Sequence, residues 1–509
     1  MSFLNPNTAI PEAAAGPRPY GLLIDGRWVE ASDGRTLERV SPSHGIAVSR
    51  YALAGVADAE RAIAAGRRAF DAGPWPRMSG RERGDLLLRT ADLLIARSEE
   101  LARLDVLESG KPITQAQGEI GAAIDMWRYA AALARDVHGE SYASLGEHVL
   151  GLTLREPVGL VSIITPWNFP FLIVSQKLPF ALAAGCTAVV KPSELTSAST
   201  LVLGEVLLEA GLPPGVVNIV VGHGADVGAR LVDHPAVDMI SFTGSTLVGR
   251  KAVAAGADTL KRVSLELGGK NGQIVFADCD LDAALDAVLF GAFFNAGECC
   301  NAGSRLIIER AAASAFLDRL VERSHEINVG DPLDPDTLVG AIITDEHLDK
   351  IEGYVNDAGQ AGARVALGGS RVETRTGRFM APTIVDGVSP GMRIAREEVF
   401  GPVLSVLTFE SAEEAVRIAN DTDYGLSAGV WSRDIDTCIG VARGVRTGTV
   451  WVNTFMDGHS ELPFGGYKQS GLGRELGRHA VTDYTETKTV QIHRGPRTNW
   501  WLPRGEKKA

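Results

Sequence analysis

The sequence predicts an α/β fold in which helices cover mainly parallel sheets, and three observations lead to this prediction. Short apolar runs, typical of buried strands, recur along the chain. Stretches with apolar residues at helical spacing separate these runs, as in βαβ units. Polar and glycine-bearing turns follow several of the runs, at the edge of a parallel sheet where ligands bind.

The first half of the chain carries most of these units. Residues 57–72 and 80–108 have helical spacing with charges on the other face. The segment GLVSIITPWNFP begins as a continuous apolar strand and stops at Pro166. The further predicted elements are, in order, a helix over 172–184, a strand over 187–192, a helix over 197–210, and strands over 216–222, 237–245 and 262–270.

A second series of elements begins near Gly268. We expect a helix over 280–294, a strand over 305–309 and a helix over 312–328. The chain ends in a short strand pattern followed by Trp500, Trp501 and Leu502. An apolar cluster so near a terminus predicts that the tail docks on another subunit or back on the body.

Composition narrows the class of protein. The chain has 509 residues, 45% of them hydrophobic, and a formal net charge of −13. Its length allows two or three domains, and its acidity argues against nucleic-acid binding. The chain has five sparse cysteines and no paired CxxC motifs, so we expect neither a disulfide framework nor a metal site. The same sparse cysteines predict that the protein works in a reducing compartment. We find no signal-peptide pattern or membrane-length apolar run, and expect a cytoplasmic protein without membrane contact.

Three turns together predict a nucleotide site. Gly224 and Gly228 lie between a strand and a helix, one residue off the usual dinucleotide fingerprint. Ser245 follows a second strand and can cap a helix whose free N–H groups hold a pyrophosphate. Glu194 lies just past a third strand, beside Lys191, where a carboxylate accepts hydrogen bonds from ribose hydroxyls. The need for positive φ in a tight turn accounts for these glycines equally well. Three such turns on successive strands of one sheet nevertheless favour a nucleotide-binding site.

Seven motifs in register resemble the NAD(P)-dependent aldehyde dehydrogenase superfamily: TPWNFP, KPSE, FTGS, LELGGK, AGECCNAGSR, EEVFGP and PFGGYKQSGLGRELG. The resemblance extends from about residue 21 to residue 492 and is nearest to the hydrolytic betaine-aldehyde and general members. It implies a Rossmann-like cofactor domain over 1–130 and 152–266 and an α/β catalytic domain over 267–480. It also implies a small β oligomerisation element with a C-terminal tail over 131–151 and 481–509, in a homo-oligomer that is a dimer or tetramer.

The resemblance implies roles for five catalytic residues. Cys300, the third residue after Gly297, is the nucleophile that forms a thiohemiacetal and then a thioester, and Cys299 occupies the variable position before it. Neighbouring side chains in extended backbone point oppositely, so one thiol can face the substrate while the other packs. Asn168 stabilises the oxyanion and Glu266 is the base that activates water. A proton relay is implied for Lys177 and Glu475, with a structural ion pair as the alternative.

The cofactor implied by the resemblance is NAD, which Glu194 favours over NADP. The residues that match the family's cofactor contacts are Thr165, Trp167, Lys191, Glu194, Gly224, Gly228, Thr243, Gly244, Ser245, Leu267, Glu398 and Phe400.

The substrate tunnel implied by the resemblance is lined by Phe169, Ile173, Gln176, Phe294, Gly458 and His459. Gln176 stands where relatives for aliphatic or betaine aldehydes often have Trp and succinate-semialdehyde enzymes often have Arg. Asp457 and Glu461 make the mouth loop acidic. We therefore expect a small to medium polar or cationic aldehyde. The alternatives are a succinate-semialdehyde-type enzyme, a CoA-acylating enzyme, which lacks the base Glu, and a cysteine-dependent esterase, thioesterase or structural protein.

Overall fold

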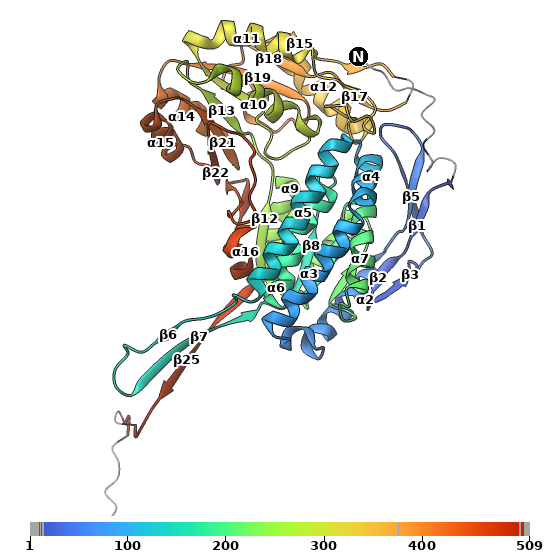
Figure 1. The fold of residues 1–509 in the computed structure, drawn as a ribbon, viewed down its shortest axis with the longest axis vertical. Helices are drawn as coiled ribbons and strands as arrows, with labels where there is room; N and C mark the ends of the chain where they lie inside the picture. Colours follow the sequence, from blue (N-terminus) through green and yellow to red (C-terminus); the bar gives the residue numbers. More distant parts are fainter. Residues whose placement is uncertain (1–9, 11, 13–14, 375, 498–499, 503–509) are drawn as a thin grey trace, which may run out of the picture.

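The computed structural model of the protein describes residues 10, 12, 15–374, 376–497 and 500–502. Two large sheets, each with its own hydrophobic core, form the body of the molecule. A three-stranded arm extends away from this body (Figure 1). The predicted α/β class is confirmed, because helices alternate with mainly parallel strands in both sheets.

The first sheet has eight strands among the described residues, in the order β24-β12-β11-β8-β9-β10-β2-β3. Its five central strands run parallel: β12 (Arg262–Glu266), β11 (Met239–Thr243), β8 (Leu160–Ile164), β9 (Thr187–Lys191) and β10 (Val217–Ile219). Antiparallel strands complete the two edges: β24 (Gly471–Leu472), β2 (Leu22–Ile24) and β3 (Arg27–Val29). The chain leaves β8 first toward β9 and β10 and later returns to β11, so the strand order reverses between β8 and β11. In such sheets ligands bind beyond the carboxyl ends of the strands at this reversal.

Helices pack around this sheet (Figure 1). They are α2 (Val56–Asp71), α3 (Gly80–Ala96), α4 (Ser98–Ser109), α5 (Ile113–Ala134), α6 (Pro170–Ala184), α7 (Ala198–Glu209), α8 (Ala229–Asp233) and α9 (Thr246–Gly256). The single helix expected over 80–108 is two helices. Arg97 separates them because its backbone leaves the helical region, with φ −110° and ψ 12°.

The second sheet has the order β15-β18-β19-β14-β13-β21-β22. Its strands are β15 (Arg364–Leu367), β18 (Thr383–Asp386), β19 (Val403–Phe409), β14 (Arg305–Glu309), β13 (Gly272–Val275), β21 (Ser427–Trp431) and β22 (Thr449–Val452), and all pairs except β15–β18 are parallel. The helices of this half are α10 (Leu281–Phe293), α11 (Arg310–Ser324), α12 (Asp345–Gln360), α13 (Arg393–Arg396), α14 (Ala412–Asn420) and α15 (Ile435–Gly444). The last helix, α16 (Gly477–Asp483), packs instead against α6 in the core of the first half. Helix α11 ends before the predicted residue 328, because backbone bonds of a turn replace helical ones after Ser324.

The arm is an antiparallel sheet of β6 (Ser141–Tyr142), β7 (Val149–Pro157) and β25 (Thr485–His493). These strands begin later than residue 131 because α5 continues to Ala134. The exposed apolar side chains of the arm and tail are Tyr142, Leu145, Leu154, Ile492, Trp500, Trp501 and Leu502. Residues 498–499 and 503–509 of the predicted tail lie outside the described residues. No helix in the described part of the chain has the length and apolar character needed to span a membrane.

Candidate active site

The candidate site lies where the carboxyl ends of β8 and β11 meet the loop that leads into β14. Strand β8 ends at Ile164 and is followed by the loop that carries Asn168, and β12, the neighbour of β11, ends in Glu266. The loop before β14 carries Cys300. Two motifs that are far apart in the sequence are joined here, since the Asn168 side chain donates to the Glu298 carbonyl at 3.0 Å. The sheet topology therefore gathers the predicted catalytic residues from both halves of the body.

The backbone before Cys300 has an unusual conformation. Asn295, Ala296 and Gly297 all have positive φ, of 51°, 53° and 69°. Gly297 is required here, because a Cβ at this position would lie 2.0 Å from the Gly401 carbonyl oxygen. For Asn295 and Ala296 the left-handed region costs roughly 1–2 kcal/mol per residue. Surrounding contacts must compensate for this strain, as is common at functional sites.

The two adjacent cysteines have different environments. Cys299 is buried in a small apolar cluster with Phe169, Ile173 and Ala302. Cys300 is only half-buried, and all five cysteines of the chain are free. A hydrogen bond with the Cys299 thiol, together with burial, raises the pKa of Cys300 well above its ordinary value. Cys300 is therefore the accessible thiol of the pair, and at neutral pH it is protonated.

Asn168 is buried, and its side-chain amide is oriented by the loop that carries Cys300. One N–H of the amide donates to the Glu298 carbonyl at 3.0 Å. Glu298 lies two residues before Cys300, so the amide is held against the loop that carries this cysteine. An amide held in this way has a second N–H available for a substrate oxygen.

Glu266 is a buried carboxylate at the end of β12. Neither of its side-chain oxygens has a hydrogen-bond partner among the described residues. Burial, and next the negative charge of Glu475, raise the pKa of Glu266 well above its ordinary value. A Cβ at Gly465 would lie 2.7 Å from one Glu266 oxygen, so a larger residue there would press on this carboxylate. An unpartnered carboxylate with a raised pKa is suited to accept a proton from water.

Lys177 and Glu475 form a buried ion pair behind Glu266. Lys177 also donates to the Ser241 hydroxyl at 3.3 Å, and Ser241 in turn lies 3.1 Å from the Tyr484 hydroxyl. Burial raises the pKa of Glu475 despite the lysine. The second Glu475 oxygen has no hydrogen-bond partner in the described part of the chain. The pair is close enough to Glu266 for the charges of Glu475 and Lys177 to act on that carboxylate.

The predicted ribose contacts lie together at the end of β9. The Lys191 ammonium lies 3.4 Å from one Glu194 oxygen, and His223 lies 3.4 Å from the other. Burial acts to raise the pKa of Glu194, but the charge of Lys191, hydrogen bonds from the backbone and His223, and the charge of His223 together outweigh it. The pKa is therefore lowered and Glu194 is ionised. Gly228 is next to this pair, since its Cβ would lie 3.7 Å from the Lys191 side chain, whereas Gly224 is exposed in the same turn.

The turn after β11 contains the predicted pyrophosphate contacts. Ser245 is exposed and caps α9, accepting a hydrogen bond from Val248 N–H at 3.4 Å. Gly244 precedes it, and Thr243 ends the strand. The hydroxyls of Thr243 and of Thr165, which follows the neighbouring strand β8, are buried and have no hydrogen-bond partner among the described residues. Unpartnered hydroxyls at a helix start fit a polar ligand such as a pyrophosphate.

A group of side chains beside Cys300 accounts for the remaining cofactor predictions. Trp167 and Phe400 pack edge to face, with ring centroids 5.5 Å apart, and His347 contacts both rings. Glu398 accepts the Gly269 N–H at 2.9 Å, and burial raises its pKa to about 7. Leu267 is buried after β12. These residues form a partly apolar wall with one carboxylate.

The predicted tunnel residues fall into two groups. Phe169 and Phe294 stack with ring centroids 6.2 Å apart, and Ile173 belongs to the same apolar cluster. Met456, which packs against this cluster, connects it to the exposed Gly458 and His459. Gln176 is half-buried on α6 and is outside the cluster. The structure thus brings the three apolar residues predicted for the tunnel together, whereas Gln176, Gly458 and His459 lie outside their cluster.

Several residues of the site were not found by sequence reasoning. Asn295 donates to the backbone carbonyls of Asn168 and Glu298, and Asn271 donates to the Cys300 carbonyl at 2.7 Å. Lys270 is buried without a hydrogen-bond partner among the described residues, and burial lowers its pKa to about 7. Asn295 directly precedes the motif AGECCNAGSR and Asn271 directly follows LELGGK, and this position beside a motif was the only signal available. No group of three or more His, Cys, Asp or Glu residues suited to a metal ion occurs within the described residues.

The comparison with protein-family models matches residues 28–490 to the aldehyde dehydrogenase family. Betaine aldehyde dehydrogenase of Bacillus subtilis is 43% identical over 484 residues, which cover 94% of this chain and 99% of that protein. Aldehyde dehydrogenase family 2 member C4 of Arabidopsis thaliana is 42% identical, with coverage of 93% and 95%.

Solved structures of high similarity come from the same family. The crystal structure of an NAD-dependent aldehyde dehydrogenase from Sinorhizobium meliloti has a TM-score of 0.97 at 49% identity, and covers 98% of this chain and 99% of that chain. Betaine aldehyde dehydrogenase from Staphylococcus aureus in complex with NAD+ has a TM-score of 0.93 at 38% identity, with coverage of 95% and 97%.

Proposed function

The chain belongs to the aldehyde dehydrogenase family, and from this premise we propose that it oxidises a polar or cationic aldehyde to the carboxylic acid with NAD, through Cys300. The protein is an NAD-dependent oxidoreductase of this family. The observation that carries the proposal is the convergence of the accessible Cys300 thiol, the Asn168 amide and the unpartnered Glu266 carboxylate.

The first step is attack of the Cys300 sulfur on the aldehyde carbon. Because the hydrogen bond with Cys299 and burial raise the pKa of Cys300, the thiol must pass its proton to solvent water as it attacks. The C–S bond forms while the carbonyl oxygen takes up negative charge. The free N–H of Asn168 and the backbone N–H of Cys300 stabilise that oxygen, and each such donor contributes about 3–4 kcal/mol in comparable sites.

The second step is hydrolysis of the cysteine thioester that remains after oxidation. Glu266 takes a proton from water as the water oxygen bonds to the thioester carbon. The C–S bond then breaks, and the Cys300 sulfur leaves as a thiol with the proton that Glu266 returns. The raised pKa of Glu266 supports this role, since a base works best with a pKa near the working pH. The Lys177–Glu475 pair adjusts the charge behind Glu266, and a relay of its proton is part of the proposal.

The residues at the ends of β9 and β11 fit NAD. Ionised Glu194 suits the ribose hydroxyls and repels a 2′-phosphate, while the α9 N-terminus and the unpartnered hydroxyls of Thr165 and Thr243 suit the pyrophosphate. Trp167, Leu267, Phe400 and Glu398 suit the nicotinamide half. These residues would hold NAD, whose nicotinamide would supply the hydride acceptor for the oxidation.

The site supports a polar or cationic substrate over a carboxylate. The buried Arg305 side chain donates to the carbonyls of Ile418 and Ala419, so it is occupied elsewhere. Asp457 in the mouth loop is exposed and bonded to Thr454. Relatives from two bacteria carry betaine aldehyde, a cationic aldehyde, in their names.

A panel of aldehydes assayed by NAD reduction tests this proposal. We expect hydroxy-, amino- and trimethylammonium-aldehydes to exceed succinate semialdehyde in kcat/KM by about ten- to a hundredfold, the worth of one missing charged hydrogen bond. The preference for cationic substrates should shrink at high salt, because the acidic loop is exposed. The highest kcat/KM for succinate semialdehyde would reject the substrate assignment.

We also propose a cytoplasmic homo-oligomer with the domains expected from the sequence. The five free cysteines support a reducing compartment. The exposed apolar residues of the arm and tail support assembly with further copies of the chain. Light scattering on a chain truncated at Gln491 should show smaller oligomers than the full chain.

A further inference from the structure

We infer that Gln115 and Asn295 are positioning residues, which hold the Asn168 amide in its reactive orientation. The inference rests on the proposed function and extends it to helix α5, which carries no residue of the recognised motifs. Asn295 acts here through Asn168 and does not itself touch the substrate.

The side chain of Asn295 joins the two loops of the site. Its amide nitrogen donates to the backbone carbonyl of Asn168 at 3.2 Å and to that of Glu298 at 2.9 Å. The same Glu298 carbonyl accepts the Asn168 side-chain amide at 3.0 Å. Asn295 therefore fixes both the backbone from which the Asn168 side chain extends and the acceptor that orients its amide.

Gln115 fixes Asn295 from the other side. Its side-chain oxygen accepts the Asn295 backbone N–H at 3.1 Å, from a position 180 residues earlier in the chain. Its amide nitrogen donates to Glu119 at 2.8 Å, and Glu119 forms a buried ion pair with Lys111. Lys111 in turn lies 4.4 Å from the centre of the Phe169 ring, next to Asn168. The chain of contacts thus closes on the loop that it supports.

This network compensates the strain of the left-handed segment. Asn295 is the first residue of the run with positive φ, and its backbone N–H donates the hydrogen bond to Gln115. Asparagine tolerates this region better than other non-glycine residues, and it also supplies the two donors. A glycine at 295 would keep the backbone conformation and remove only the donors, so it separates the two contributions.

The main test uses Asn295→Gly, with Asn168→Ala as reference, in the full-length enzyme. We expect Asn295→Gly to slow the first turnover of NADH formation by about ten- to a hundredfold, as for a displaced oxyanion donor. Alkylation of Cys300 by iodoacetamide and the Kd for NAD should not change, because alkylation develops no carbonyl oxyanion. In the Asn168→Ala background the same substitution should add less than about threefold, since both act through one amide.

Gln115→Met gives a milder test, with Gln117→Met as its control. Gln117 is exposed on the same helix, and its substitution should leave the first turnover unchanged. Gln115→Met should slow it by about three- to tenfold, with alkylation again unchanged. A wild-type first turnover in Asn295→Gly, a parallel loss of alkylation, or full multiplication of the effects in the double variant would each overturn the inference. Full activity of Asn168→Ala would instead refute the proposed oxyanion role itself.

Discussion

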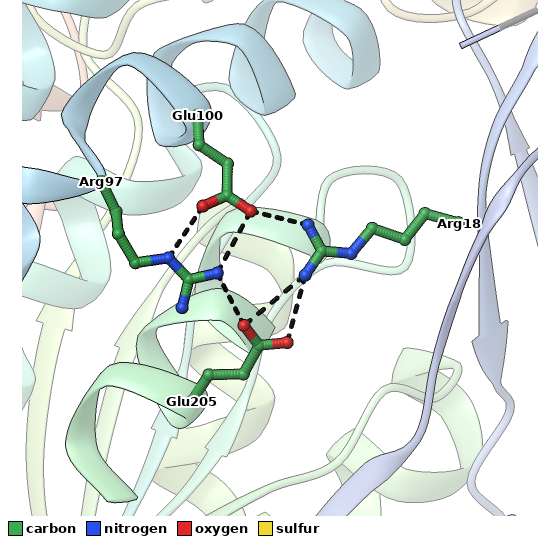
Figure 2. Close-up of polar contacts among 4 residues, drawn as sticks. All are labelled: Arg18, Arg97, Glu100 and Glu205. Carbon is green, nitrogen blue, oxygen red and sulfur yellow. Dashed lines mark hydrogen bonds and ion pairs between the residues drawn. The ribbon is translucent and has the colours of Figure 1, made fainter. Parts of the chain in front are cut away.

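Two groups of cationic and carboxylate side chains in this protein differ in exposure and in how completely their charges are paired. In the first, Arg18 and Arg97 bind Glu100 and Glu205 in a closed network that joins β1 (Arg18–Tyr20) to α4 and α7 (Figure 2). Its four side chains are 24–41% exposed. In the second, Lys177, Glu266 and Glu475 are all buried, and one cation faces two carboxylates.

The difference lies in whether every charge has a partner. Burial acts to raise the pKa of Glu100, but its bonds to Arg97 and Arg18 outweigh it, so the pKa is lowered. Burial and the charge of Glu475 raise the pKa of Glu266, which has no partner of its own. A complete network fixes an N-terminal strand on the body, whereas an incomplete one keeps a carboxylate able to exchange its proton. The proposed role of Glu266 as a base depends on this missing partner.

The largest effect should come from the nucleophile itself. Cys300→Ala should lower kcat/KM for propanal by at least about a thousandfold, because the covalent route is lost. Cys299→Ala should keep most activity, since its side chain packs in the apolar cluster. NADH formation and NAD binding are measured for both variants. Full activity in the Cys300 variant would remove the basis for treating this region as catalytic.

Glu266→Gln tests whether the unpartnered Glu266 carboxylate acts as the base in thioester hydrolysis. We expect the burst of NADH to stay near one equivalent per active subunit, while steady-state turnover falls by about a hundredfold or more. Stopped-flow absorbance separates the two phases. Unchanged steady-state turnover would mean that the unpartnered carboxylate has another purpose.

Substituting one cation in each group compares how much the two sets of ion pairs contribute to the free energy of unfolding. Lys177→Met should lower the free energy of unfolding by about 3 kcal/mol, because it leaves Glu475 buried without its cation. Arg97→Met should cost about 1 kcal/mol or less, because Arg18 still binds both carboxylates in a partly exposed setting. Urea denaturation at pH 7 measures both. Equal losses would contradict the comparison.

The smallest effect concerns the pH dependence of stability. The folded-state pKa of Glu266 lies above the unfolded one, so its contribution is fully favourable below the unfolded pKa and is lost as pH rises through the folded pKa. The Tm of the wild type should therefore fall relative to that of Glu266→Gln as pH rises from 5 to 9, by about 2 °C or more. Parallel Tm curves would show that the carboxylate is already compensated.

The sequence was sufficient for the chemistry of single residues. Periodicity predicted the alternating strands and helices, because spacing within short stretches of chain carries that information. The resemblance of the motifs to aldehyde dehydrogenases predicted Cys300 rather than Cys299 as the nucleophile, with Glu266 as base and Asn168 as oxyanion donor, and these roles stay predictions. Boundaries were less certain, as the division of 80–108 at Arg97 illustrates.

Only the tertiary structure decided which of these groups are paired. Lys177 and Glu475 are 298 residues apart, and Gln115 reaches Asn295 across 180 residues. No local pattern encodes such contacts, because they arise when the sheet order brings distant loops to one edge. For the same reason the sequence could name Glu266 as a base but could not show that it is buried, unpartnered and raised in pKa. Burial and partners are properties of the packed chain, and they set the free energy of the charged form.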